Sequence, residues 1–436
     1  MLDTMGAQPE EQGYRFRVWA PNAQRVYVTG TFNEWAKGKH RLKKDGNGYW
    51  SGVVAEAKPG DEYKYRIIGP NGEELSRMDP YSRMVTNSVG NSIIPPPGPM
   101  CEPQRFGIPP LNRLVIYEIH IGTFGLEQGD RPGTIRAAIK WLPYLKELGV
   151  NAVQIMPLAE FPGGYSWGYN PSMIFAVESD YGSPADLCEF VSKAHELGIA
   201  VILDVVYNHF GPSDLDLWRF DGWQENDKGG IYFYNDWRSA TPWGDTRPDY
   251  GRGEVREYIK DNALFWLREY NLDGLRFDST IYMRNVHGYN SDPGSDLPEA
   301  WGLLQWVNNE IQAAKPGAIT IAEDLQNNPQ ITKETSEGGA GFLSQWDARF
   351  VHTIRETLLL PDDTSRDMNK VRDALVHRYD LDAFHRVVYT ESHDEVANGR
   401  ARVAEEVAPG DAGNWFAKRK SALGAALVFT APGVPM

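Results

Sequence analysis

The segment Gly274-Leu-Arg-Phe-Asp278 is a short, mostly apolar run that ends in a carboxylate. Three other segments have the same pattern, and this repetition decides the fold. Each of the four ends or directly follows a run that is typical of a buried β-strand. Together they carry three candidate carboxylates, an Arg and two His. One such segment would mean little, since Asp and Glu close many strands, but four in order predict one shared site. The other three are Asp204-Val-Val-Tyr-Asn-His209, Ile321-Ala-Glu-Asp324 and Glu391-Ser-His-Asp394.

Beyond residue 110 the chain alternates predicted strands with predicted helices. Apolar residues share a helical face over 135–145, where Pro143 indicates a kink, and again over 255–266. Ser183-Pro-Ala-Asp186 has the cap, the early Pro and the acid of a helix start. This alternation predicts an α/β fold, a (β/α)8 TIM barrel over residues 110–436. The eight predicted strands are 115–121, 151–156, 200–206, 273–278, 319–323, 343–347, 386–391 and 426–430.

The predicted barrel explains why the four segments matter, because the C-terminal ends of barrel strands converge on one site. Residues 207–253 are rich in Gly, Trp and Asp and too long for an ordinary loop, so we expect an excursion beside this face. The predicted eighth strand lies only a few residues before Met436. We therefore expect the barrel to end directly after that strand, as in a truncated chain.

The first part of the chain follows a different pattern, with short alternating strands separated by Gly- and Pro-rich turns. This spacing predicts a small all-β sandwich over residues 10–98. Pro95-Pro-Pro-Gly-Pro99 predicts a stiff linker between the sandwich and the barrel. The predicted sandwich strands are 14–19, 25–29, 49–54 and 62–67.

The composition argues against several classes of partner. A net charge of −15 disfavours nucleic acid and anionic membranes. No apolar run approaches about 18 residues and the N-terminus lacks the pattern of a signal peptide, so we expect no membrane span and a cytoplasmic location. Cys101 and Cys188 are too few to predict a disulfide framework, which fits a reducing compartment. The 14 Trp and 21 Tyr suit stacking on neutral sugars.

The quoted segments resemble the α-amylase family, glycoside hydrolase family 13, over roughly residues 110–436, and the sandwich resembles the family 48 carbohydrate-binding module. The resemblance implies an enzyme that acts on α-glucan. It implies Asp278 as the nucleophile, Glu323 as the general acid/base and Asp394 as a third carboxylate that holds sugar hydroxyls. It also implies substrate-binding roles for Arg276, His209, His393, Asp204 and, in Gly168-Tyr-Asn-Pro-Ser172, Tyr169.

Three further positions carry weaker implications of the same resemblance. In the sandwich, Trp35 and Lys64 match positions that contact glucan in glycogen-binding members. Many such modules only buttress the barrel, so a packing role stays open. Asn208 matches a calcium position of many α-amylases, but no acidic loop supports a metal site here, and we predict no required metal. No dinucleotide or phosphate-binding fingerprint occurs, so we predict no cofactor.

The chemistry asks for these residue types independently of the resemblance. A retaining glycosidase needs one carboxylate that attacks the anomeric carbon and one acid that protonates the leaving oxygen, roughly 5–5.5 Å apart. The attacking group must stay ionised, and we expect Arg276 to lower the pKa of Asp278. The acid needs a raised pKa, which we expect nearby carboxylates to supply for Glu323.

The family contains hydrolases and transferases, so the reaction has to be predicted from details. Ser392-His-Asp-Glu-Val396, Ile321-Ala-Glu-Asp324 and Ile281-Tyr282 resemble branching enzymes, and we expect a 1,4-α-glucan branching enzyme. Residues 204–212 are closer to maltooligosyl-trehalose trehalohydrolases and debranching enzymes, which keeps an α-glucan hydrolase open. A non-catalytic glucan-binding fragment is the third alternative. The candidate aromatic surfaces for an acceptor chain are Trp167, Trp243, Trp301 and Trp306.

Overall fold

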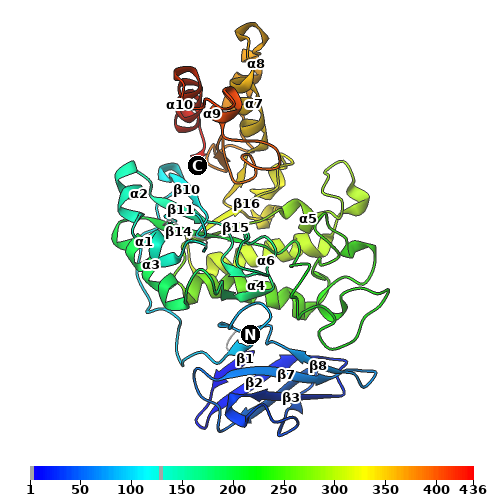
Figure 1. Ribbon diagram of the computed structural model, residues 1–436. Coiled ribbons are helices and arrows are strands. Elements are labelled where there is room, and N and C mark those ends of the chain that lie inside the picture. Colours follow the sequence, from blue (N-terminus) through cyan, green and yellow to red (C-terminus); the bar gives the residue numbers. More distant parts are fainter. Residues whose placement is uncertain (1–3, 127–130) are drawn as a thin grey trace.

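The computed structural model describes residues 4–126 and 131–436 of the chain. Figure 1 shows a β-sandwich at one end, a central parallel sheet with helices around it, and the last helices gathered at the opposite end. Helices α4 and α6 lie between the central sheet and the sandwich (Figure 1). Within the described ranges, no helix is long and apolar enough to cross a membrane.

The sandwich consists of two antiparallel sheets, in the orders β1-β2-β6-β5 and β4-β3-β7-β8, with β9 paired to β7. In β2, Phe16 and Val18 are buried while Arg15 and Arg17 alternate with them, as expected for a strand with one core-facing side. All four predicted strands are present, each within a residue of the predicted bounds. The strands are β1 Gly6–Pro9, β2 Tyr14–Trp19, β3 Arg25–Gly30, β4 His40–Arg41, β5 Lys43–Lys44, β6 Tyr49–Val54, β7 Glu62–Ile68, β8 Glu74–Arg77 and β9 Ser92–Ile93.

The barrel is formed by eight parallel strands that pair in sequence order. One apolar cluster joins Ile116 of the first strand to Val434 of the last, with residues of β11, β14, β16, β17 and β18 between them. The predicted (β/α)8 fold is therefore confirmed. The strands are β10 Ile116–Ile119, β11 Ala152–Ile155, β14 Ala200–Val205, β15 Gly274–Phe277, β16 Ile319–Ala322, β17 Ser344–Trp346, β18 Arg386–Val388 and β19 Val434–Pro435, and a separate hairpin holds β12 Ala159–Glu160 and β13 Met173–Val177.

Helix boundaries follow their local capping signals. The Ser183 hydroxyl accepts from the Asp186 amide, and the Asp186 carboxylate accepts from the Ser183 amide, which is the predicted start of α3. Pro143 occupies the first turn of α2, so the predicted kink is a break between two helices. The α-helices are α1 Ile135–Ile139, α2 Leu142–Leu148, α3 Pro184–Glu196, α4 Gly253–Glu269, α5 Thr280–Arg284, α6 Pro298–Ala314, α7 Ala348–Leu359, α8 Met368–Val376, α9 Val403–Val407 and α10 Trp415–Thr430.

Short 3-10 helices occupy several connections, including the excursion between β14 and α4 and the crossover from β16 to β17. They are η2 Thr31–Asn33, η3 Leu111–Arg113, η4 Gly230–Tyr232, η5 Trp237–Ser239, η6 Pro293–Ser295, η7 Pro329–Ile331, η8 Thr335–Glu337 and η9 Asp363–Ser365.

The prediction of the eighth strand at 426–430 is wrong. These residues form the last turns of α10, and the eighth strand is Val434–Pro435. Five apolar or small residues in a row fit a buried strand and the end of a helix equally well, so periodicity could not separate them. Pro432, which has no N–H to continue the helix, follows the end of α10, and Gly433, with a φ of 151°, leads the chain into the eighth strand.

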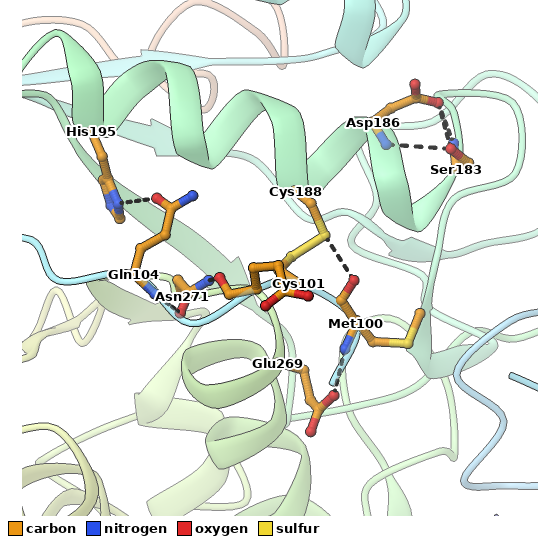
Figure 2. The surroundings of a disulfide bond; sticks show 10 residues. Met100, Cys101, Gln104, Ser183, Asp186, Cys188, His195, Glu269 and Asn271 are labelled. Atoms are coloured by element: carbon orange, nitrogen blue, oxygen red, sulfur yellow. Dashed lines mark hydrogen bonds between the residues drawn. A yellow bond between two sulfur atoms is a disulfide. The ribbon is translucent and has the colours of Figure 1, made fainter. Parts of the chain in front are cut away.

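The structure contains a disulfide, although two cysteines were too few to predict a disulfide framework. Cys101, two residues after the Pro-rich linker, is bonded to Cys188 on α3, and Figure 2 shows the segment around Cys101 beside this helix. Beside the bond, the Met100 amide donates to the Glu269 carboxylate at 2.9 Å. The linker is therefore fixed to the barrel by a covalent bond and by hydrogen bonds. The two cysteines lie 87 positions apart in the sequence, and no local sequence pattern predicts that they are close in space.

The sandwich holds the excursion between β14 and α4. Arg77, at the end of β8, donates to three successive carbonyl oxygens, those of residues 218–220, at 3.1 to 3.3 Å. In the connection between β2 and β3, the amide and side chain of Asn22 both donate to the Asp221 carboxylate. Because buried carbonyls without donors are costly, Arg77 stabilises the conformation of this part of the excursion.

We expect Arg77→Ala to lower the free energy of unfolding by about 1–3 kcal/mol, because three carbonyls lose their donor. Urea denaturation followed by tryptophan fluorescence measures the change. Lys39→Ala is the matched control, since its ion pair with Glu56 is half-exposed on both sides and contributes little. Equal effects of the two substitutions would contradict the role assigned to Arg77.

Candidate active site

The candidate carboxylates lie at the C-terminal ends of neighbouring barrel strands. Asp204 lies in β14, Asp278 directly follows β15 and Glu323 directly follows β16. The register pairs Asp204 with Arg276, and Arg276 and Asp278, two residues apart, point to the same side of their strand. The structure therefore brings these four sequence-predicted residues together, at the face where barrel enzymes carry their sites.

Arg276 is fully buried and binds all three of these carboxylates. Its Nη1 donates to Asp204 at 2.5 Å and to Asp278 at 3.1 Å, and its Nη2 lies 2.8 Å from an oxygen of Glu323. The guanidinium carbon also lies 4.2 Å from the centre of the Trp346 ring. One planar cation thus fixes the relative positions of Asp278 and Glu323.

Two more donors orient the same pair of carboxylates. The Asn208 side chain donates to Asp278 Oδ2 at 2.7 Å and to the Asp278 carbonyl at 2.9 Å. The Ser279 amide donates to Glu323 Oε2 at 2.8 Å. Ser279 has a φ of 41°, in the left-handed region that a serine rarely adopts, and this conformation accompanies the turn of its N–H toward Glu323.

Burial, more than charge, sets the protonation of these groups. It raises the pKa of Asp278 to about 6, although the charge of Arg276 acts to lower it. Burial, followed by the charges of Asp278 and Asp394, raises the pKa of Glu323 to about 7 against the effect of Arg276. Arg276 lowers the pKa of Asp278 as expected, but burial raises it by more. For Glu323, burial raises the pKa more than the neighbouring carboxylates do.

His393 pairs with Glu118, a residue that the sequence analysis missed. The His393 Nδ1 lies 2.9 Å from Glu118 Oε1, and the His393 amide donates to the other oxygen. Burial alone would lower the pKa of His393, but the hydrogen bond and charge of Glu118 raise it to about 9, so the imidazole is a cation at neutral pH. Its ring stacks on Tyr169 at 4.9 Å, and its Nε2 lies 3.3 Å from Asp394.

His209 has the opposite protonation state. Burial lowers its pKa to about 4, so the ring is neutral at pH 7. Its Nδ1 bonds to the side-chain oxygen of Asn208, and its ring stacks on Trp243 with centres 4.6 Å apart. Among the aromatic candidates for an acceptor surface, Trp243 therefore lies beside this histidine, and Trp167 lies edge-on to His393 at 5.5 Å.

The remaining predicted residues have different surroundings. Tyr169 donates its hydroxyl to Asp204 at 2.6 Å, in addition to the ring stacking. Trp35 and Lys64 belong to the sandwich, at the end of η2 and in β7, on a sheet separate from the barrel. Trp301 and Trp306 lie on α6, packed against the apolar core.

The carboxylates and histidines of this site pair with one another and with Arg276. Over residues 4–126 and 131–436, no three His, Cys, Asp or Glu side chains are grouped in a way that could hold a metal ion. Asn208, the residue at the calcium position of the resemblance, directs its amide nitrogen to Asp278, and its oxygen bonds to His209. A cation would need the side-chain oxygen of Asn208, but that oxygen is already bonded to His209 and the amide nitrogen points at Asp278.

Two family models match parts of this chain. The family described as "Carbohydrate-binding module 48 (Isoamylase N-terminal domain)" matches residues 4–82, and "Alpha amylase, catalytic domain" matches residues 116–217. A 1,4-alpha-glucan branching enzyme GlgB of Oceanobacillus iheyensis is 31% identical over 97% of this chain, and one of Rhodopseudomonas palustris is 33% identical over 99%. The chain spans 68% and 62% of the lengths of these two curated relatives.

Solved structures share the fold over almost the whole chain. A Salmonella typhimurium protein described as an α-amylase superposes with a TM-score of 0.77 at 26% identity, covering 99% of this chain and 72% of its own. A pullulanase from Paenibacillus barengoltzii, solved with maltohexaose and α-cyclodextrin, superposes with a TM-score of 0.77 at 20% identity, covering 99% and 73%. At that identity the pullulanase shows the fold alone. The chain belongs to the α-amylase family of enzymes, glycoside hydrolase family 13, with a family 48 carbohydrate-binding module before the barrel.

Proposed function

We propose that this chain is a 1,4-α-glucan branching enzyme that cleaves α-1,4 bonds and makes α-1,6 branches with retention of configuration. The observation that carries the proposal is that Arg276 binds both Asp278 and Glu323. The chain that holds them is similar to branching enzymes over 97–99% of its length. We propose residues 10–98 as the binding module and 110–436 as the catalytic barrel. Its partner is a neutral α-glucan, in keeping with the acidic net charge.

In the first step, Asp278 attacks the anomeric carbon of the glucose unit on the donor side. The α-1,4 bond breaks, and Glu323 gives its proton to the departing 4-oxygen. A covalent glucosyl ester of Asp278 remains. The pKa values favour these two roles, because Glu323 stays protonated close to neutral pH while Asp278 ionises at a lower pH.

In the second step, the 6-hydroxyl of another glucan segment attacks the same carbon. Glu323 takes the hydroxyl proton, the new α-1,6 bond forms and Asp278 leaves as a carboxylate. The cationic His393 donates to sugar hydroxyls, and Asp394 accepts from them. The neutral His209 also bonds to sugar hydroxyls. Exposed indole rings at Trp167 and Trp243 can cover the ester and hold an acceptor in place of water.

An α-glucan hydrolase is the alternative, supported by the likeness of residues 204–212 to trehalose-releasing and debranching enzymes. The three carboxylates around Arg276 are all present, which argues against a non-catalytic fragment. In the sandwich, the contacts of Arg77 and Asn22 with the excursion favour a packing role, while the half-exposed Trp35 and the partly exposed Lys64 keep glucan binding possible.

The reaction is tested by incubating the protein with amylose and following iodine absorbance and reducing ends together, before and after isoamylase treatment. We expect iodine absorbance to fall with few new reducing ends, and many new ends to appear after debranching. Asp278→Ala should abolish both changes, because no covalent intermediate can form. Reducing ends that rise in step with the loss of colour would identify a hydrolase, and no change in either signal would contradict both readings of the site.

The pH profile of kcat/KM tests the two carboxylate roles. The rate should fall below a pH of about 6, where Asp278 takes up a proton, and above about 7, where Glu323 loses its proton. With α-maltotriosyl fluoride the alkaline decline should disappear, because fluoride leaves without an acid. A profile that keeps the same alkaline decline with both donors would contradict the assignment of Glu323 as the acid.

A further inference from the structure

The loop of residues 389–402 joins β18 to α9 and carries Asp394, the third candidate carboxylate. Arg276 fixes three other carboxylates of the site, whereas the Asp394 side chain is 46% exposed and depends on its loop for its position. We propose that Arg355 of α7 is a positioning residue for Asp394, because it binds both ends of this loop and so holds the carboxylate beside Glu323. The catalytic value of this placement rests on the proposed function.

Arg355 joins the beginning of the loop to its end. The residue is 2% exposed and lies in the second half of α7. Its Nη1 donates to the Thr390 carbonyl at 3.0 Å, and its Nη2 donates to the Ala401 carbonyl. The same Nη2 lies 3.1 Å from Glu406 Oε1, the oxygen that accepts from the Ala401 amide at 2.8 Å. One planar guanidinium therefore closes the loop, and its rigid fork determines how far apart the two ends lie.

The residue that follows Asp394 is anchored to the same helix. Glu395 is 8% exposed, and its Oε2 lies 2.7 Å from Arg400 Nη1 and 3.7 Å from Arg355 Nε. Its Oε1 lies 3.3 Å from Nε2 of His352, one turn before Arg355 on α7. Burial acts to raise the pKa of this carboxylate, but His352 and the two arginines lower it. Helix α7 thus holds the loop at both ends and directly beside Asp394.

A second attachment comes from the first barrel strand. The two carboxylate oxygens of Glu118, on β10, bind the ring and the amide of His393. The residue before Asp394 is therefore fixed from inside the barrel, and Arg355 fixes the backbone on both sides of it from outside. Between these two attachments, little freedom is left for the backbone of Asp394.

The position of Asp394 matters because its charge acts on the acid/base. Burial first, and then the charges of Asp278 and Asp394, raise the pKa of Glu323 against the effect of Arg276. Tyr389, directly after β18, also faces Glu323 and is neutral, because burial raises its pKa. If the loop loses its shape and Asp394 moves away, the pKa of Glu323 falls, since a nearby negative charge that favours its protonated form is lost.

The pH profile of kcat/KM for amylose tests the role of Arg355. Arg355→Ala should lower kcat by at least about tenfold, since a displacement of about 1 Å can cost up to about a hundredfold. It should also move the alkaline decline from a pH of about 7 to a lower pH, because Asp394 no longer raises the pKa of Glu323. Iodine absorbance follows the turnover, whether the glucan is branched or hydrolysed. A lower kcat with an unmoved alkaline decline would show a purely structural role and would overturn the proposal.

Two further variants make the test specific. Arg349→Ala removes an exposed arginine from the same helix and should leave kcat and the alkaline decline unchanged. Glu395→Gln keeps the volume of the side chain but removes the charge that His352 and Arg400 bind, so it should move the alkaline decline in the same direction as Arg355→Ala. If Arg355→Ala does not fold, Glu395→Gln decides, and an alkaline decline that stays in place in this variant would overturn the proposal.

Hydrogen exchange followed by mass spectrometry examines the loop without requiring turnover. In the full-length Arg355→Ala variant, the amides of residues 390–401 should exchange at least about tenfold faster, while those of β15 and β16 keep their protection. Unchanged exchange in the loop would overturn the proposal. If the wild-type protein turned over no glucan while the variant loop exchanged faster, the proposed function would fail and the contacts of Arg355 with the loop would stand, so the two failures can be told apart.

Discussion

Burying several carboxylates at the end of one barrel costs free energy that only a paired positive charge can offset. Arg276 supplies that charge to Asp204, Asp278 and Glu323, and its own pKa is raised far above the usual value: burial acts to lower it, but the charges of its partners prevail. Because the guanidinium is planar and rigid, it also fixes where these carboxylates can lie. The relative placement of Asp278 and Glu323, the proposed nucleophile and acid, thus depends on one side chain of β15.

Burial raises the pKa of both proposed catalytic carboxylates, to about 6 for Asp278 and to about 7 for Glu323. The charge of Arg276 favours the ionised form of both groups, and Asn208 adds a hydrogen bond to Asp278. Neighbouring carboxylates act in the opposite direction, Asp204 on Asp278 and both Asp278 and Asp394 on Glu323. Around this pair, His393 is kept cationic by Glu118 and His209 is kept neutral by burial. The proposed site therefore contains one cationic and one neutral imidazole.

The sequence was sufficient to predict the barrel and the residues that end its strands, because a carboxylate after an apolar run is a local signal. Glu118 escaped prediction because its partner His393 is 275 residues away and its strand carries no such signal. The disulfide likewise depends on long-range packing. The eighth strand was misplaced because an apolar stretch before Gly433 fits a helix end as well as a strand.

Direct observation of the covalent intermediate tests the central claim, that Arg276 holds Asp278 as the nucleophile opposite Glu323 as the acid/base. Incubating Glu323→Gln with α-maltotriosyl fluoride allows glycosylation, because fluoride needs no acid, and slows the second step, because its base is absent. Mass spectrometry of the digested protein should find one maltotriosyl group on the peptide that contains Asp278. An adduct on another residue, or no adduct while the fluoride is consumed, would contradict the account.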